Sequence, residues 1–481
     1  MSYFALTLPL PLLIWMLWWM QSLAFNYASA RKTGVPILVR YITPTNPLWM
    51  VFGNLLIKAC AYSPFGNGRF TRFYSLGWAA NDRYRVHLEL GDVFMLVTPG
   101  GNRLYVSDPV VALNIMKRRR DFGRDIKMMQ FLSVYGENVF TAAGKDWQKH
   151  RKATMIAFAD IDELVWQESL NQADILLRSW LQSTEPVRSL ADDTKVLTSN
   201  AGACVVAFRT YVIRMVEEEK AEIRAGTRSR HNLVASLVRA CKTHHPEGHR
   251  LEPGSDTTSI TLATAILFLA AHPAVQEWIA EEVAHYTSAL GVSHTDCALF
   301  PKLERCKAVM LETLRICHPV SQIIKKTGPA PETIPVRSKC IIIPPRTAIQ
   351  INMSSLQTDP NIWGEDSLLW KPRRWMEGGP ASQTDLESET LLPDTKGSYM
   401  PWAIDQHVCP GKKYSQLELV AVIAKAIGEY EVLPALCPGE SVEEARRRLI
   451  HIAMETESKT LLNDIKNPES AALVWKPQVR R

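Results

Sequence analysis

The chain has 481 residues, 46% of them hydrophobic, so it is long enough to bury one large core or two domains. No internal repeat and no long linker divides it, which favours a single large domain. Its net charge of +6 is small for this length and argues against a nucleic-acid-binding protein. Nine cysteines without paired spacing indicate a reducing compartment. No Cys-x-x-Cys zinc pattern appears. A glycine-rich phosphate loop is also missing, which argues against a fused nicotinamide or flavin domain.

The first apolar segment, residues 3–25, carries no charge and is rich in Leu, Trp, Met, Ile and Phe. As a helix it would be roughly 35 Å long at about 1.5 Å per residue, enough to cross a hydrocarbon core of about 30 Å. A cleaved signal peptide would have a basic start, which is missing, and Arg31-Lys32 follow the segment instead. We therefore expect a single-pass membrane anchor at residues 3–25, and a folded body at residues 31–481 that faces the cytosol.

The rest of the chain has mostly helical patterns. Alternating apolar residues predict strands in Arg85 to Val106, and a strand pair in Cys340 to Asn352 that Pro344-Pro345 interrupts. Apolar residues at helical spacing predict helices at residues 108–119, 162–181, 232–242, 273–289 and 416–430. The expected fold class is mainly α with a small β-sheet.

Two of the helical segments carry polar side chains that can act together. Trp147 and Arg151 are four residues apart, so on a helix they share a face and can offer two donors to one anion. Asp256-Thr257 precedes the apolar stretch 260–271, and an acid beside a hydroxyl can relay protons through water. Taken singly, a half-buried Trp beside a solvated Arg and an ordinary helix start are the simpler interpretations.

A third helical run contains Glu312 and Arg315 and ends at Pro319. Three residues apart on a helix, the two side chains can form an ion pair. Most such pairs lie on the surface and contribute little to stability, so the pair alone indicates no function.

Cys409 is followed by Pro410-Gly411 and then by an apolar helical stretch that begins near Lys412. The first turn of a helix offers unpaired N–H groups and the positive end of its dipole, and both lower the pKa of a thiol. Gly411 lets a large flat ligand approach the backbone closely. For a lone cysteine, a buried structural role is the alternative.

Together these motifs resemble those of the cytochrome P450 monooxygenases, in the form common among fungal members. The matching stretches are Pro-Trp with Cys-Pro-Gly-Lys-Lys, Glu-x-x-Arg, a Pro-x-Arg-aromatic turn at Pro372 to Trp375, Trp-x-x-x-Arg, and Gly-x-Asp-Thr-Thr. The resemblance implies the cytochrome P450 fold and a haem b cofactor, with Cys409 as the axial thiolate ligand of the iron.

The resemblance also implies roles for other residues. Asp256 and Thr257 would manage protons for the activation of O2. The residues implied to contact the haem are Trp147, Arg151, His407 and Gly411. Glu312, Arg315 and Arg374 would form a buried charge network that supports the haem loop, and losing one partner of such a network costs roughly 3–5 kcal/mol.

The chain departs from the family pattern in two ways. In the loop, Asp405 and His407 stand where the family has Gly and Arg, and Pro253 replaces a small residue before the proton-relay motif. The interval between Arg151 and Asp256 is short, as if roof helices around 198–253 were incomplete. A gene-model error, a decaying copy and a working enzyme with an open pocket would each explain this. The cluster His244, His245 and His249 has no other ligand at metal spacing and is expected to be incidental.

The function implied by the resemblance is that of a haem-thiolate monooxygenase, which inserts one atom of O2 into an apolar small molecule in fungal secondary metabolism. Its electrons would come from NADPH through a membrane-bound reductase, and its location would be the endoplasmic reticulum membrane. A basic face for that reductase is expected from Lys149, Lys152, Lys412 and Lys413, with merely solvated lysines as the alternative. Two other functions stay open: a catalytically inactive haem-binding or apo protein, and a haem-thiolate isomerase or dehydratase that needs no external electrons.

Overall fold

The computed structural model describes most of the chain: residues 9–61, 68–126, 139, 141–142, 144–157, 161–202, 255–289, 291, 293–377, 386–392, 397–404, 407–458 and 462–478. The helices of these ranges are α2 (Pro9–Arg31), α3 (Pro47–Ala61), α4 (Arg69–Tyr74), α5 (Trp78–Asp82), α6 (Arg85–Leu90), α7 (Pro109–Lys117), α9 (Gly144–Ala157), α10 (Asp162–Gln182), α13 (Ser255–Ala271), α14 (Pro273–Ala284), α15 (Glu304–Ile316), α16 (Met353–Leu356), α17 (Pro360–Trp363), α18 (Lys412–Glu429) and α19 (Val442–Met454). The strands are β1 (Ile37–Val39), β2 (Val93–Thr98), β3 (Gly101–Val106), β4 (Phe122–Gly123), β5 (Gln322–Thr327), β6 (Glu332–Val336), β7 (Lys339–Ile343), β8 (Ala348–Asn352), β9 (Tyr430–Pro434), β10 (Thr456–Ser458), β11 (Asn463–Ile465) and β12 (Leu473–Pro477).

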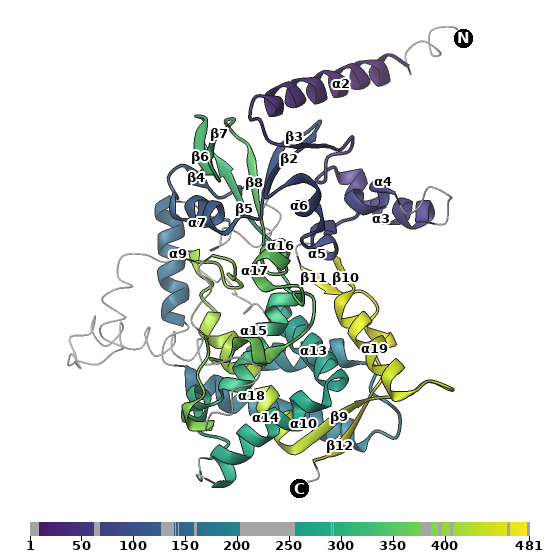
Figure 1. Cartoon of the computed structure of the whole chain (residues 1–481), viewed down its shortest axis with the longest axis vertical. Helices are drawn as coiled ribbons and strands as arrows, with labels where there is room; N and C mark the ends of the chain where they lie inside the picture. Colours follow the sequence, from purple (N-terminus) through teal and green to yellow (C-terminus); the bar gives the residue numbers. More distant parts are fainter. Residues whose placement is uncertain are drawn as a thin grey trace, which may run out of the picture.

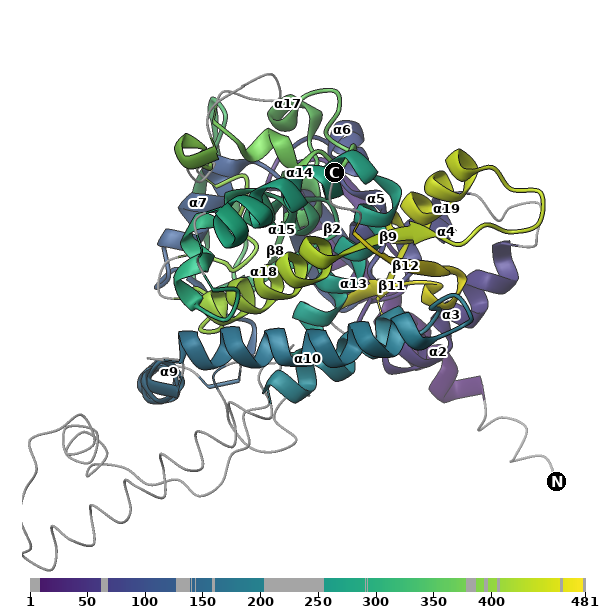
Figure 2. The same ribbon diagram turned by 90° about the horizontal axis from the view of Figure 1, so that it is seen from below.

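The larger sheet lies at one end of the molecule together with α2 and α3, and the helices α10, α13, α14 and α18 lie at the other end (Figure 1). The sheet has the order β1-β2-β3-β8-β5-β4, and three two-stranded sheets accompany it in the described ranges. At the other end α18 packs against α10, α14 and α15, and α10 runs alongside α18 in the second view (Figure 2). The prediction of a mainly helical fold with small sheets is confirmed.

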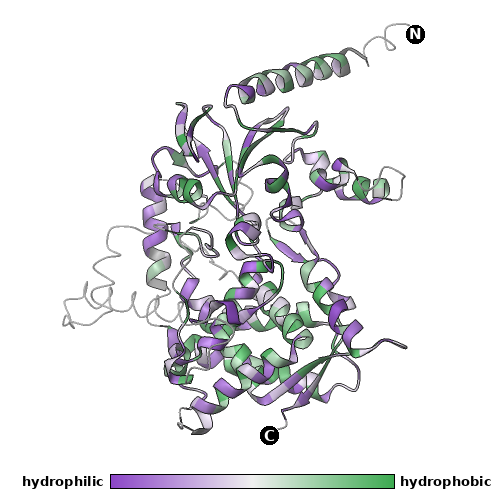
Figure 3. Ribbon diagram, in the orientation of Figure 1, coloured by the Kyte–Doolittle hydropathy of each residue, from purple (hydrophilic) through white to green (hydrophobic). Residues whose placement is uncertain are grey.

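Helices α13 and α18 form the centre of the helical core. Every residue from Thr261 to Ala271 in α13 is buried, as is every residue from Leu417 to Ala424 in α18. A helix that is apolar on all sides is stable only when other elements surround it. The hydropathy colouring shows this concentration of apolar residues where α13, α14 and α18 meet (Figure 3).

Most of the predicted elements exist, with small shifts in their ends. Asp108 caps α7 by accepting the N–H of Val111 at 2.8 Å. The helix predicted at 273–289 is α14 followed by one π-helical turn, His285–Ala289, and the helix predicted at 416–430 already begins at Lys412. The helix predicted at 232–242 lies outside the described residues.

Two strand predictions were wrong. Arg85–Leu90 is the helix α6. The backbone N–H of Val86, near its start, donates to the Asp82 carboxylate at 2.8 Å, and Gly91, at φ +88°, ends the helix. β7 and β8 do not pair with each other: β7 pairs with β6, and β8 lies between β3 and β5. β7 forms a hairpin with the neighbouring strand β6, whereas β8 joins the large sheet beside β3, a partner far away in the chain that a local pattern does not specify.

Within the described residues, no single helix combines the length and hydropathy that a membrane span requires. A pair of helices, Asp256–Ala271 and Pro273–Ser288, meets that requirement together but is bent by 109°. The membrane anchor at residues 3–25 therefore stays a prediction.

Candidate functional site

Cys409 lies in a loop that leads into α18, and the backbone of this loop is held at both ends. The N–H of Cys409 donates to the carbonyl oxygen of Trp402 at 2.7 Å, and the carbonyl of Cys409 accepts the N–H of Lys412 at 3.2 Å. Gly411 occupies the N-cap position of α18. These bonds hold Cys409 three residues before α18. The residue as a whole is exposed, but its thiol group is largely surrounded by protein atoms.

The electrostatic surroundings of the Cys409 thiol contain opposing effects. Close packing of protein around the thiol raises its pKa, while the N–H of Gly411 and the positive charge of Arg151 lower it. The sequence predicted a lowered pKa at this helix start. The N–H of Gly411 does lower the pKa of the thiol as expected, but the effect of burial is larger, so the pKa is raised overall.

Helix α9 brings Trp147 and Arg151 to the cysteine loop. The rings of Trp147 and His407 contact each other, with centroids 4.4 Å apart and planes inclined by 49°. Arg151, one turn further along the same face, interacts electrostatically with Cys409. The structure thus brings four of the predicted site residues together: Trp147, Arg151, His407 and Cys409.

This set of side chains fits a haem group chemically. A cysteine thiolate is a ligand for haem iron, and the indole, guanidinium and imidazole groups beside it are donors suited to anionic carboxylates. Cys409 is exposed, and Gly411, whose N–H bonds to the Cys409 thiol, has no side chain that would obstruct a flat ligand. The residues present therefore match the donor set that a haem with two propionates requires.

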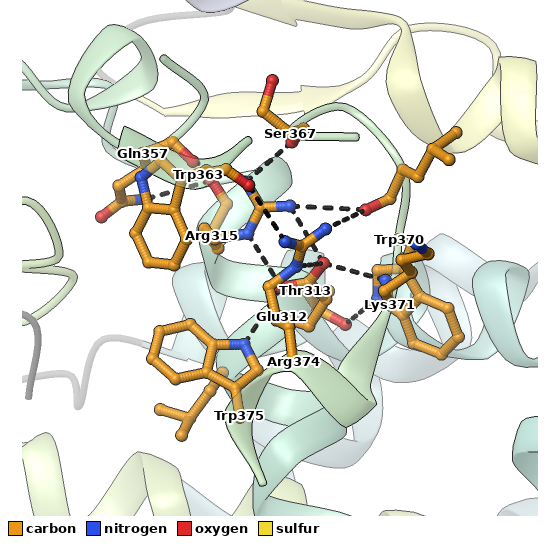
Figure 4. Close-up of polar contacts among 12 residues, drawn as sticks. Glu312, Thr313, Arg315, Gln357, Trp363, Ser367, Trp370, Lys371, Arg374 and Trp375 are labelled. Carbon is orange, nitrogen blue, oxygen red and sulfur yellow. Dashed lines mark hydrogen bonds and ion pairs between the residues drawn. The ribbon is translucent and has the colours of Figure 1, made fainter. Parts of the chain in front are cut away.

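Behind this loop, Glu312 and Arg315 of α15 form a fully buried ion pair (Figure 4). Two guanidinium nitrogens of Arg315, Nε and Nη2, donate to the two carboxylate oxygens of Glu312 at 2.8 and 2.9 Å. The third nitrogen, Nη1, donates to the carbonyl oxygens of Gln357 and Ser367 at 2.7 and 2.8 Å. The pair therefore connects α15 to two segments more than 40 residues away.

Arg374 completes the network from the 3₁₀ turn Pro372–Trp375. Its Nε donates to Oε1 of Glu312 at 2.9 Å, and its Nη2 donates to the carbonyl oxygen of Asp366 at 3.1 Å. Sequence reasoning had placed Arg374 with Glu312 and Arg315, and the three side chains do meet. It missed Trp375, whose indole N–H donates to Oε2 of Glu312, although this aromatic residue belongs to the same Pro-x-Arg-aromatic turn.

The predicted proton-relay residues lie at the start of α13. The carboxylate of Asp256 is exposed and forms an ion pair with Lys195 at 3.3 Å. Thr257 is half-buried, and its carbonyl oxygen accepts the hydroxyl of Thr261 at 2.8 Å. Lys195 had not been predicted as a partner of this motif, because its sequence surroundings contain no signal for it.

Several other predicted features lie outside the described residues: Asp405, Pro253, the segment 203–254 and the cluster His244, His245 and His249. Three of the four lysines expected to form a basic face have local partners, and the fourth, Lys152, is exposed. Lys149 pairs with Asp146 at 3.0 Å, Lys413 lies 3.8 Å from Asp162, and the ammonium of Lys412 lies 5.5 Å from the ring centre of Trp402.

Sequence reasoning missed three further features around the cysteine loop: the backbone angle of Ala403 and the contacts made by Trp402 and His318. Ala403 adopts φ +56°, a left-handed conformation that is unfavourable for any residue except glycine. The indole N–H of Trp402 donates to Ser415 Oγ at 3.0 Å. His318 contacts the loop across 83 residues of sequence. A backbone angle and two tertiary contacts leave no local pattern, so the sequence contained no signal for them.

Comparison with known proteins identifies the same family as the motifs. The cytochrome P450 family model matches residues 251–462, which include Glu312, Arg374 and Cys409. Cytochrome P450 monooxygenases from Penicillium roqueforti and Penicillium rubens are each 24% identical over 558 aligned residues, covering 95% of both chains. A cytochrome P450 monooxygenase of a phomenoic acid biosynthesis cluster in Leptosphaeria maculans is 23% identical and covers 74% of this chain and 78% of its own. The 558-residue alignments exceed the 481 residues of this chain, so those two relatives carry residues without a counterpart here.

Proposed function

The chain belongs to the cytochrome P450 family, and we propose that it inserts one oxygen atom of O2 into an apolar small molecule with electrons from an NADPH-dependent reductase. The observation that supports this function best is the convergence of Trp147, Arg151, His407 and Cys409 at one site. The family binds haem through a cysteine thiolate, and the donor side chains beside Cys409 support this residue as that ligand.

The bound haem would supply the activation of O2, and the protein residues would hold it in place. Cys409 would provide the thiolate ligand, while Trp147, Arg151 and His407 would donate hydrogen bonds to the propionates. The buried network of Glu312, Arg315 and Arg374 would keep α15 rigid behind the loop. Its role is structural, because every donor and acceptor in it already bonds to protein.

In this proposal Asp256 takes a proton from solvent, and Thr257 next to it passes the proton inward. The exposed carboxylate of Asp256 supports the first part of this role. Lys195, whose ammonium lies 3.3 Å from the carboxylate of Asp256, would hold this side chain at the start of α13.

The remaining parts of the proposal concern location, partners and pathway. Exposed apolar side chains along α2, among them Leu13, Ile14, Leu17 and Phe25, support a membrane anchor at residues 3–25 of a protein of the endoplasmic reticulum. Lys152 and Lys412, both exposed near the site, support docking of an acidic reductase. The biosynthetic cluster named for the Leptosphaeria relative supports a role in secondary metabolism.

The test is the carbon monoxide difference spectrum of the reduced full-length chain, expressed with its N-terminus and supplied with haem. The expected result is the red-shifted Soret band of a thiolate complex, lost in Cys409→Ser and retained in Cys437→Ser, which removes another exposed cysteine. Absence of haem, or a band typical of neutral ligands in the unmodified chain, would overturn the proposal. If the thiolate band forms but substrate turns over without reductase and NADPH, the enzyme is an isomerase or dehydratase.

The anchor is tested separately by flotation of the chain with liposomes of neutral and anionic phospholipids. We expect the full-length chain to float and a chain lacking residues 3–25 to remain in the soluble fraction. Equal flotation of the two chains would show that these residues do not provide the anchor.

A further inference from the structure

His318 is a buried histidine whose two ring nitrogens both bond to backbone groups. Nδ1 lies 2.9 Å from the N–H of Val320, and Nε2 lies 3.0 Å from the carbonyl oxygen of Pro401. The N–H of Val320 can only donate and the carbonyl of Pro401 can only accept. Nδ1 is therefore unprotonated and Nε2 carries the hydrogen, in agreement with burial lowering the pKa of His318 to about 4.

The segment that carries His318 is anchored to two other parts of the fold. It follows α15 directly: the N–H of Cys317 closes that helix on the carbonyl of Thr313 at 2.9 Å. On the other side, Asn463 of β11 donates its backbone N–H to the carbonyl of Pro319 at 2.8 Å. The backbone on both sides of His318 is therefore held by hydrogen bonds. His318 lies only three residues after Arg315 of the buried network.

From Pro401 the contact continues to the thiol-bearing residue. Pro401 precedes Trp402, whose carbonyl oxygen accepts the N–H of Cys409 at 2.7 Å. The indole of Trp402 is held in turn by Ser415, whose hydroxyl also donates to the carbonyl of Lys412 at 3.0 Å. The bond from His318 to the Pro401 carbonyl therefore orients the Pro401–Trp402 peptide group. The carbonyl of Trp402, the next one along the chain, is the one that accepts the N–H of Cys409.

We propose that His318 is a positioning residue for Cys409: its Nε2–H holds the Pro401–Trp402 peptide and links the buried Glu312 network to the cysteine loop. The contact gives a rigid connection between two segments 83 residues apart in sequence. Its effect on haem ligation rests on the proposed function, whereas its effect on the loop backbone does not.

Two substitutions separate the two bonds of the ring. In His318→Gln the side-chain amide nitrogen can reach the former position of Nε2 and still donate to Pro401. In His318→Asn the shorter side chain can replace only Nδ1, so it keeps the bond to Val320 and loses the bond to Pro401. His87→Asn is the matched control, because His87 is equally buried but bonds through Nδ1 to the carbonyl of Gly91 at 3.0 Å, in α6.

The first measurement is hydrogen exchange of the full-length chain without added haem, read in the peptide that contains residues 401–411. One lost backbone contact changes local opening by roughly a factor of ten. We expect exchange about tenfold faster in His318→Asn, within about threefold of wild type in His318→Gln, and unchanged in His87→Asn. Equal exchange in wild type and His318→Asn, or equally fast exchange in all three variants, would overturn the proposal.

The second measurement is the carbon monoxide spectrum of the haem-loaded variants. We expect His318→Asn to lose at least about half of the thiolate-type band to the neutral-ligand type, and His318→Gln to retain it. Retention of the full band in His318→Asn would overturn the effect on ligation. If the wild-type chain takes up no haem, the proposed function fails, and the exchange measurement alone decides the role of His318.

Discussion

The indole N–H of Trp375 donates to Oε2 of Glu312 at 3.0 Å. Arg315 shares that oxygen, and the other oxygen of Glu312 accepts Nε of Arg374 and the backbone N–H of Lys371, both at 2.9 Å. The carboxylate is fully buried, so these donors replace all of its water. A buried charge is tolerated only when it is this completely bonded.

Glu312→Gln should therefore be strongly destabilising. It leaves the fully buried guanidinium of Arg315 without a counter-charge, and the free energy of unfolding should fall by about 3–5 kcal/mol. Urea unfolding of the apo chain measures this loss. The control is Glu443→Gln, which removes an exposed pair with Arg446 and should change stability by less than about 1 kcal/mol. A similar loss for both variants would contradict the network's importance.

Ala403→Gly should stabilise the protein. At φ +56° alanine bears a steric penalty of about 1–2 kcal/mol that glycine avoids, against an entropy cost of roughly 0.5–1 kcal/mol for glycine in the unfolded chain. The net gain is about 0.5–1 kcal/mol in the free energy of unfolding, measured by urea titration. Ala424→Gly within α18 should instead lose about 1 kcal/mol. A loss of that size at Ala403 as well would show that its conformation carries no strain.

Glu418→Gln should change how stability depends on pH. Glu418 is fully buried in α18, and neither carboxyl oxygen has a partner in the part of the chain that the structure describes, so burial raises its pKa to about 8. Because this lies above the ordinary value of 4.5, the native state holds the proton more tightly than the unfolded state. The resulting stabilisation is complete below about pH 4.5 and is lost as the pH rises through about 8.

Gln mimics the protonated carboxyl group, so Glu418→Gln should be more stable than wild type at pH 8 by on the order of 1–4 kcal/mol, with little difference at pH 5. Urea unfolding at the two pH values measures this, and the exposed Glu443→Gln serves again as control. A difference between Glu418→Gln and wild type that does not vary with pH would contradict a protonated Glu418.

The contact between Trp147 and His407 should appear as coupling in haem retention. The centroids of the two rings are 4.4 Å apart, so the packing of each ring fixes the direction in which the other ring's N–H group points. We expect Trp147→Leu and His407→Ala each to speed haem loss. The loss of haem-binding free energy in the double variant should be smaller than the sum of the two single losses by about 0.5–1.5 kcal/mol. Transfer of haem to apomyoglobin measures the rates. Additive effects would show that the two side chains act independently.

Local patterns predicted the features whose partners lie within one or two turns. Trp147 and Arg151 share a face because they are four residues apart, and Asp108 caps α7 as expected. The two failures have different causes. Arg85–Leu90 alternates like a strand but is a helix, and the carboxylate that fixes its start, Asp82, lies only four residues before Val86. β7 pairs with the preceding strand β6 in a hairpin, whereas β8 pairs with the distant strand β3, and only this last contact lies beyond what a local pattern can specify.

By itself the sequence determined the family, because its motifs resemble those of known members, and that resemblance also made Cys409 the candidate iron ligand. The helical fold class followed from local periodicity. Only the tertiary structure showed that burial opposes thiolate formation at Cys409, that Asp256 faces Lys195, and that His318 reaches Pro401. Those features depend on atoms brought together from distant parts of the chain. At these three places, the burial of the groups, the charges around them and their hydrogen-bond geometry are set by the packing of distant segments, which a short stretch of sequence does not specify.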